Sequence, residues 1–269
     1  VFLWNGKTGQ LLRRLPCRGN AALSTDGQLL ALEKQRSCWD PPDVKTSITV
    51  WGADYKSRYS VLGGGPLAFS PDRKWLAGIS PDDPDDVRVW EAETGKVARD
   101  LKGNTGGMKQ YHSSTVNALV FSLDSALLIT GGGGGSDRAG KNNKVRVFEV
   151  ATGRQVRQFA GHTPPRDEEN RGARAAGGVY SLSVSPDGKL LASAGLDRTV
   201  LVRELETGKA VRSFEIERGY NACVLFLPDG KTLVSGDING IRFWDLASGQ
   251  QVYSVPGPIG YAQATPRGL

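Results

Sequence analysis

The fold of this chain is decided by the stretch S-P-D-G-K-L-L-A at Ser185–Ala192, because near copies of it recur along the sequence. In each copy an alternating apolar run precedes a turn-forming phrase, and a second apolar run follows it. Gly accepts a positive φ and Asp bonds to nearby backbone, so these residues suit a tight connection between two strands. The other copies are S-T-D-G-Q-L-L-A at Ser24–Ala31, S-P-D-R-K-W-L-A at Ser70–Ala77, S-L-D-S-A-L-L-I at Ser122–Ile129, L-P-D-G-K-T-L-V at Leu227–Val234 and the incomplete T-P-R-G-L at Thr265–Leu269.

A second phrase opens the chain and follows each complete copy of the first. It is a short strand pattern that usually ends on a large aromatic residue, and in most copies a Thr-Gly or Ser-Gly turn comes next. The copies are V-F-L-W at Val1–Trp4, I-T-V-W at Ile48–Trp51, V-R-V-W at Val87–Trp90, V-R-V-F at Val145–Phe148, V-L-V-R at Val200–Arg203 and I-R-F-W at Ile241–Trp244.

The two phrases together define a repeat of about 51 residues, since Asp26 and Asp229 are four repeats apart. Each repeat holds four short runs with period-two alternation, separated by turn signals, which predicts a four-stranded antiparallel sheet. One small sheet cannot bury both of its faces. Stacking such sheets around an axis buries them and leaves only short edges exposed.

On these residues the chain resembles the WD-repeat β-propeller family, and it is similar to a fragment of a bacterial-type WD-repeat protein. The resemblance implies a single all-β domain over residues 1–269, with five complete blades and a partial sixth at the chain ends. We expect strands three and four of one blade at the start, a lone first strand near Ile259–Thr265, and therefore an incomplete seam and a natural chain that continues past Leu269. The approximate blades are 1–15 (partial), 16–62, 63–103, 104–160, 161–215, 216–255 and 256–269 (partial).

The resemblance also implies a buried hydrogen-bond chain of His, Ser or Thr, Asp and Trp in some blades. Only the fourth complete repeat carries most of this set, as His162, Ser193 and Asp197. Arg203 stands there in place of Trp, which raises the expectation of an ion pair between Arg203 and the buried Asp.

A basic column follows the turn glycines, four residues on in each case. The formal net charge of the chain is +6. A basic stripe could bind nucleic acid, but charged residues on the outermost strand of a blade also discourage edge pairing, and arginine stems cover apolar surface. We favour the second interpretation and predict no nucleic-acid partner. The column consists of Arg13, Arg99, Arg157, Arg212 and Tyr253.

The residues in excess of a minimal blade are expected on one rim of the ring. Long segments occur between second and third strands and between consecutive blades, and both kinds of connection emerge on the same side. Repeat proteins place their elaborations on the binding face. The long segments are Arg36–Thr46, Ser80–Asp86, Gly103–Thr115, Gly131–Lys144 and Gly161–Gly178. The candidate partner-binding residues in them are Trp39, Asp82, Asp83, Asp85, Asp86, Tyr111, Arg138, Lys141, Arg166, Arg171 and Arg174.

Several chemical functions find no support in the sequence. The four aspartates at 82–86 lack the spacing of an EF-hand, so a solvated acidic loop is favoured over a calcium site. Gly135 and Gly140-Lys141 have the spacing of a phosphate-binding loop, but Asn142 and a following strand do not fit that motif. With two His and no catalytic motif, we predict no catalytic residue, no metal and no cofactor.

The cysteine content and the length of the apolar runs bear on where the protein is located. The three Cys are odd in number and far apart, which favours a reducing compartment such as the cytoplasm. The longest apolar run is too short for a spanning helix. The sequence therefore predicts a non-enzymatic interaction scaffold or sensor module whose partner is a protein, a peptide or another domain of a longer parent chain. The alternative is a propeller enzyme or a divalent-ion-binding domain that uses clustered carboxylates on the same face.

Overall fold

The computed structural model shows an all-β chain. It describes residues 2–4, 8–14, 19–34, 46–83, 85–102, 116–133, 143–162, 178–195, 197–215, 223–237 and 239–257. Within these ranges the strands form five four-stranded antiparallel sheets and one two-stranded sheet. The sheets confirm the predicted blades of four antiparallel strands.

In each four-stranded sheet the strands lie side by side in chain order. The first sheet contains β3 (Ala21–Leu23), β4 (Leu29–Lys34), β5 (Ser47–Gly52) and β6 (Ser57–Leu62). The second contains β7 (Gly64–Phe69), β8 (Trp75–Ile79), β9 (Val87–Glu91) and β10 (Val97–Leu101). The third contains β11 (Val116–Phe121), β12 (Leu127–Gly132), β13 (Lys144–Glu149) and β14 (Gln155–Ala160). The fourth contains β15 (Val179–Val184), β16 (Leu190–Gly195), β17 (Thr199–Glu204) and β18 (Ala210–Glu215). The fifth contains β19 (Cys223–Phe226), β20 (Thr232–Asp237), β21 (Gly240–Asp245) and β22 (Gln251–Pro256), and the two-stranded sheet pairs β1 (Phe2–Trp4) with β2 (Leu11–Arg14).

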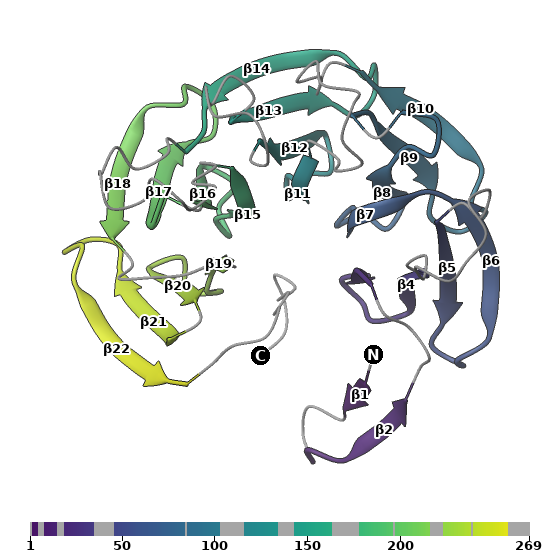
Figure 1. Cartoon of the computed structure of the whole chain (residues 1–269), viewed down its shortest axis with the longest axis horizontal. Coiled ribbons are helices and arrows are strands. Elements are labelled where there is room, and N and C mark those ends of the chain that lie inside the picture. The colour runs from purple at the N-terminus through teal and green to yellow at the C-terminus, as the bar shows by residue number, and fades with distance from the viewer. Residues whose placement is uncertain are drawn as a thin grey trace, which may run out of the picture.

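The five sheets follow one another around a central axis (Figure 1), with first strands such as β15 toward the middle and fourth strands such as β18 on the outside. The two-stranded sheet lies beside the first sheet, and an opening separates it from β22. Within the described residues β1 pairs only with β2. The lone strand expected near Ile259–Thr265 lies outside the described residues, so the expected seam stays a prediction.

The core lies between neighbouring sheets, because alternate side chains of each strand face opposite neighbours. Leu233 and Trp244 of the fifth sheet pack against Ala192 and Val202 of the fourth, and all of these are buried. Trp90 of the second sheet, which is 1% exposed, packs in the same manner against the first sheet. Each sheet is therefore held by the apolar face of the next.

The Ser-Asp turns between first and second strands are closed by their own side chains. Ser185 Oγ donates to Asp187 Oδ1 at 2.6 Å and accepts from the amide of Leu190 at 2.8 Å. The backbone reverses at Gly188, whose φ is 74°. Arg73 and Ser125 occupy the equivalent turn position with φ of 65° and 62°, so the turn imposes the left-handed conformation even where the sequence has lost its Gly.

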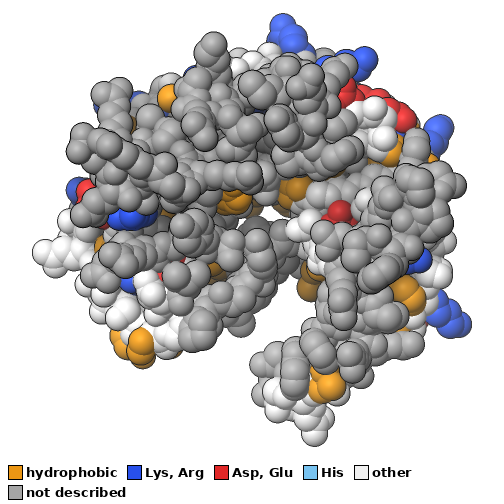
Figure 2. Space-filling model, in the orientation of Figure 1, with side chains coloured by type: hydrophobic (Ala, Val, Ile, Leu, Met, Phe, Trp, Pro, Cys, Tyr) orange, Lys and Arg blue, Asp and Glu red, His pale blue; other side chains and the backbone are white. Residues whose placement is uncertain are grey.

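Strand alternation defines two rims. Second and fourth strands end on one side, which carries the long connections at residues 35–46, 80–86, 102–115, 133–143 and 161–178; we call this side the loop rim. First and third strands end on the other side, which carries the Ser-Asp and Thr-Gly turns; we call it the turn rim. In the view of Figure 2, Lys and Arg side chains lie mainly around the outer edge of the molecule, and hydrophobic side chains show both near its middle and at its lower edge.

The turn geometry gives a first testable prediction. Gly188→Ala should lower the free energy of unfolding by about 1–2 kcal/mol, because a left-handed residue with a Cβ is strained by about that much. A Cβ at Gly188 meets nothing within 4 Å, so the loss reports the backbone alone. Gly208→Ala should cost more, since its Cβ would also overlap the ring of Phe159. Urea unfolding of the two variants beside Lys189→Ala tests this, and equal stability of Gly188→Ala and the Lys189 control would contradict it.

Candidate functional site at the loop rim

The loop rim is anchored by buried polar side chains at strand ends. Glu33, near the end of β4, is 6% exposed and lies between the first and second sheets. Its Oε2 accepts the backbone amide of Asn20 at 3.0 Å and the side-chain amide of Asn20 at 2.7 Å. Its Oε1 accepts the amide of Gly65 at 2.9 Å. One carboxylate thus fixes the entry to β3 and the start of β7.

The aspartates of the acidic segment at residues 82–86 contact residues that lie close to them in the sequence. Asp82 Oδ2 lies 2.7 Å from the guanidinium of Arg88 on β9, and Asp83 Oδ1 accepts the amide of Asp85 at 3.0 Å. Asp85 itself is 6% exposed. Burial and the charge of Asp83 raise the pKa of Asp86. These aspartates are therefore structural parts of the β8–β9 connection.

Arg88 is the cation that organises this segment. It also binds Asp100 of β10, with Nε 2.6 Å from Oδ1 and NH2 2.8 Å from Oδ2. The hydrogen bond from Arg88 lowers the pKa of Asp100, and the same bond raises the pKa of Arg88. Among the described residues there is no group of three His, Cys, Asp or Glu side chains that could hold a metal ion.

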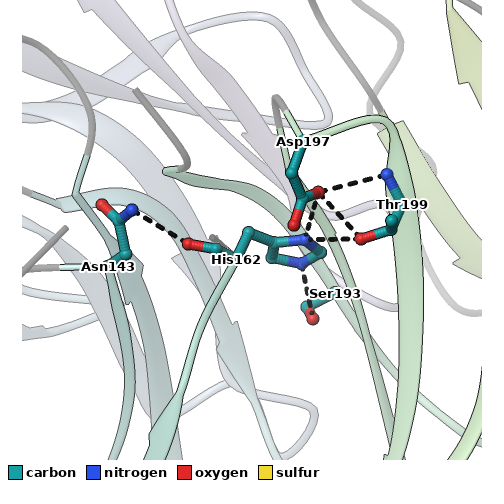
Figure 3. A network of polar contacts seen from close by, with 5 residues as sticks. All are labelled: Asn143, His162, Ser193, Asp197 and Thr199. Carbon is teal, nitrogen blue, oxygen red and sulfur yellow. Dashed lines mark hydrogen bonds and ion pairs between the residues drawn. The ribbon is translucent and has the colours of Figure 1, made fainter. Parts of the chain in front are cut away.

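A buried hydrogen-bond network lies between the third and fourth sheets (Figure 3). His162 is 1% exposed, and its Nδ1 lies 2.8 Å from Asp197 Oδ1 and 3.1 Å from Thr199 Oγ1. Its Nε2 lies 3.0 Å from Ser193 Oγ, and its carbonyl accepts the side-chain amide of Asn143 at 2.9 Å. Burial acts to raise the pKa of Asp197, but the hydrogen bonds from His162 and Thr199 outweigh it, so that pKa is lowered.

The expected ion pair between Arg203 and the buried Asp is wrong. Asp197 Oδ1 contacts His162 and Thr199, whereas Arg203 Nε is buried with no hydrogen-bond partner in the structure. Desolvation lowers the pKa of Arg203. The chain direction explains the outcome: Asp197 precedes β17 at the loop rim, and Arg203 lies near the other end of the same strand.

The basic column on the outer strands connects consecutive sheets. Arg99 NH1 donates to the carbonyl of Ala151 in the next sheet, and Arg212 donates to the carbonyls of Leu246, at 3.1 Å, and Ala247. Tyr59, at the equivalent place on β6, donates its hydroxyl to the carbonyl of Ala92 at 2.6 Å. These side chains therefore link neighbouring sheets through hydrogen bonds on the turn rim, and they do not form a free basic stripe.

The family described as WD40, "WD domain, G-beta repeat", matches residues 107–149 and 171–203. The first segment contains β11, β12 and β13, and the second contains β15, β16 with Ser193, and most of β17. The comparison thus identifies WD40 repeats in these two segments of the chain.

Three relatives with curated names share 24–28% identity with the chain. The apoptotic protease-activating factor 1 of Rattus norvegicus is 28% identical over 74% of this chain and 13% of its own length. The target of rapamycin complex subunit wat1 of Schizosaccharomyces pombe is 26% identical over 60% of the chain and 42% of its own length. The nuclear distribution protein PAC1 of Coccidioides posadasii is 24% identical over 92% of the chain and 53% of its own length. The matched region thus spans between about an eighth and about half of each of these WD40 proteins.

The repeat positions that the sequence singles out fall in the WD40 core. Trp90, Phe148 and Trp244 are buried, and Trp51 is half-buried against Leu30. Trp244 Nε1 donates to Ser235 Oγ at 2.9 Å, so the fifth sheet keeps the Ser–Trp part of the network that the fourth has lost. The side chain of Trp4 lies outside the described residues.

Most of the predicted partner-binding residues lie outside the described part of the chain. They are Trp39, Tyr111, Arg138, Lys141, Arg166, Arg171 and Arg174. Sequence reasoning missed Glu33, Asn143 and Arg146 as rim residues. The available signal was a polar residue beside or inside an apolar run, which is uncommon unless it is paired.

The His162 network predicts a pH-dependent stability. A carboxylate whose pKa is lowered in the folded state stabilises the fold above its unfolded pKa of about 3.9, and this contribution is lost as pH falls toward the folded pKa. Asp197→Asn should therefore lower the free energy of unfolding by about 2 kcal/mol at pH 7, as expected for a hydrogen bond to a charged group. The difference from the native chain should shrink below about pH 4.

Urea unfolding at pH 7 and pH 3.5 measures both values. Glu206→Gln, at an exposed carboxylate, is the control and should change little at either pH. A difference for Asp197→Asn that stays constant between the two pH values would contradict the assignment.

Proposed function

We propose that this chain is a non-enzymatic interaction scaffold or sensor module that presents its loop rim to a protein or peptide partner. The observation that carries the proposal is the placement of every long connection at the ends of second and fourth strands, above a frame of stacked sheets. Binding residues favour loops on a rigid scaffold. Glu33 and Asn143 supply that rigidity at the base of the rim.

The comparisons support an interaction role. One of the WD40 relatives is named as the subunit of a complex, and another as a protease-activating factor. The matched region is 42% of the first of these proteins and 13% of the second. The partner we propose is accordingly either a separate protein or another domain of a longer parent chain, and not a nucleic acid.

The alternative of an enzyme or ion-binding domain draws no support from the described contacts. It requires the aspartates at 82–86 to converge with carboxylates of other loops. Asp82 is instead paired with Arg88, and Asp83 caps the amide of Asp85.

No helix among the described residues is long and apolar enough to cross a membrane.

The rim assignment predicts which substitutions abolish partner capture. Trp39→Ala, and separately the removal of residues 166–174, should reduce recovery of native partners by at least about tenfold, because truncation of a central aromatic or arginine anchor removes most of the binding energy. Quantitative affinity capture with the full chain, followed by mass spectrometry, measures the recovery.

The control is a pair of substitutions on the turn rim. Lys189→Glu and Lys231→Glu lie beside the Ser-Asp-type turns and should leave recovery unchanged while altering surface charge. Retained capture by both loop-rim variants, together with loss in the turn-rim pair, would place the binding face on the opposite side.

A further inference from the structure

Three third strands carry an arginine at the same register. Arg88 on β9, Arg146 on β13 and Arg242 on β21 are each the second residue of the phrase that ends on an aromatic. Arg88 is bound by carboxylates of its own sheet and loop, at 2.6 Å from Asp100 and 2.7 Å from Asp82. Arg242 NH1 lies 2.6 Å from Asp237 Oδ2. At this register the fold holds a guanidinium against a carboxylate.

Arg146 differs from the other two in lacking the carboxylate. It is 6% exposed, its Nε is buried without a hydrogen-bond partner, and the structure records no hydrogen bond or ion pair between its guanidinium and the described residues. Burial lowers its pKa, and the nearest charge that acts on it is Asp85 of the neighbouring sheet's loop. Among the described residues, Arg146 is thus a buried cation that no carboxylate contacts directly.

The strand register shows which residues stand around Arg146 at the positions of those carboxylates. Asp100 lies opposite Arg88 on the outer strand, whereas Gln158 lies opposite Arg146. Asp237 ends β20 two residues beyond the partner of Arg242, and Gly132 occupies that place at the end of β12. The positions equivalent to Asp100 and Asp237 are therefore neutral around Arg146, whereas the position equivalent to Asp82 falls in the β12–β13 connection, outside the described residues.

The place of Arg146 connects it with the loop rim. It is the third residue of β13, directly after a long connection, and it lies on the same strand face as Phe148 two residues on. Phe148 packs in the core between the second and third sheets. A guanidinium stays charged at all relevant pH values, so its burial without a counter-ion is unfavourable until an anion arrives.

We propose that Arg146 binds a carboxylate of an acidic peptide segment that docks on the loop rim between the second and third sheets. This proposal rests on the proposed function and names the chemistry of its partner. The ligand is a carboxylate rather than a nucleic-acid phosphate, because the same register holds Asp side chains in the second and fifth sheets. A bidentate arginine–carboxylate contact then supplies both charge and orientation.

The test uses the full chain and a fluorescein-labelled hexaglutamate peptide at 150 mM salt. Arg146→Met should weaken binding at least tenfold. Arg154→Met removes the same charge from an exposed turn-rim position and should change binding less than twofold. A hexaglutamine peptide should not bind. Equal weakening by the two variants, or no binding of hexaglutamate to the native chain up to 1 mM, would overturn the proposal.

A stability measurement separates a binding residue from a structural one. Removing an unpaired buried cation relieves its desolvation, so Arg146→Met should raise the midpoint of thermal unfolding. Arg242→Met breaks a buried pair and should lower the midpoint. A fall for Arg146→Met as large as that for Arg242→Met would show that Arg146 is satisfied within the fold and would overturn the proposal.

Two further outcomes keep this proposal distinct from the proposed function. Binding of a single-stranded oligonucleotide that depends on Arg146 and exceeds hexaglutamate binding would overturn the carboxylate assignment. If Arg146→Met loses the peptide while the loop-rim variants keep their native partners, Arg146 is supported as a carboxylate site and the rim assignment of the proposed function fails.

Discussion

The rest of this structure depends on the burial of one sheet face against the next. A four-stranded sheet with period-two side chains has two apolar faces and cannot hide either by itself. Trp90, Phe148 and Trp244 each fill the space toward the preceding sheet, and the small residues Ala77 and Ala192 receive the neighbour on the opposite face. Because these contacts fix the sheets as a stack, the strand ends fall on two separate rims. Long connections can then vary on one rim without disturbing the core, which is the physical basis for a binding face there.

Polar contacts tighten this stack at its periphery, where apolar packing ends. On the turn rim, Tyr59, Arg99 and Arg212 reach from an outer strand to carbonyls of the next sheet. Burial raises the pKa of Tyr59, so its hydroxyl stays a donor throughout the physiological range. Tyr253 stands at the same register on β22, is 62% exposed and lies against Phe243, with ring centroids 5.7 Å apart. The residues at this register therefore have in common a long side chain that can donate a hydrogen bond. A positive charge is not required, since tyrosine occurs among them as well as arginine.

Most of the fold could be predicted from the sequence, because its information is local and repeated. Ser-Pro-Asp-Gly sets a turn through its own side chains, and period two sets the strands, so neither step needs long-range contacts. The candidate site was harder to predict from the sequence than the fold, for a specific reason. Arg88, Arg146 and Arg242 stand in nearly identical phrases, and they differ in whether the sheet places a carboxylate beside them, Asp100 for Arg88 and Asp237 for Arg242, which only the strand register reveals. The pairing of Asp197 with His162 rather than Arg203 likewise depends on which end of β17 each side chain occupies.

Among the described residues, three arginines have a buried Nε without a hydrogen-bond partner: Arg99, Arg146 and Arg203. Arg99 is held through its NH1 by the carbonyl of Ala151, and the surroundings of the other two assign them different roles. Arg203 replaces the Trp of the repeat near the turn rim and is only half-buried, so its stem packs while its outer nitrogens reach water. It needs no ligand to be tolerated. Arg146, at the loop-rim end of β13, is 6% exposed, so less of its side chain reaches water. Arg88 and Arg242, at the equivalent positions, are each paired with an aspartate. The strand geometry at Arg146 therefore suits a carboxylate, and the described residues do not supply one. An arginine that stands where the positions equivalent to Asp100 and Asp237 are neutral is the arrangement expected where a partner provides the carboxylate.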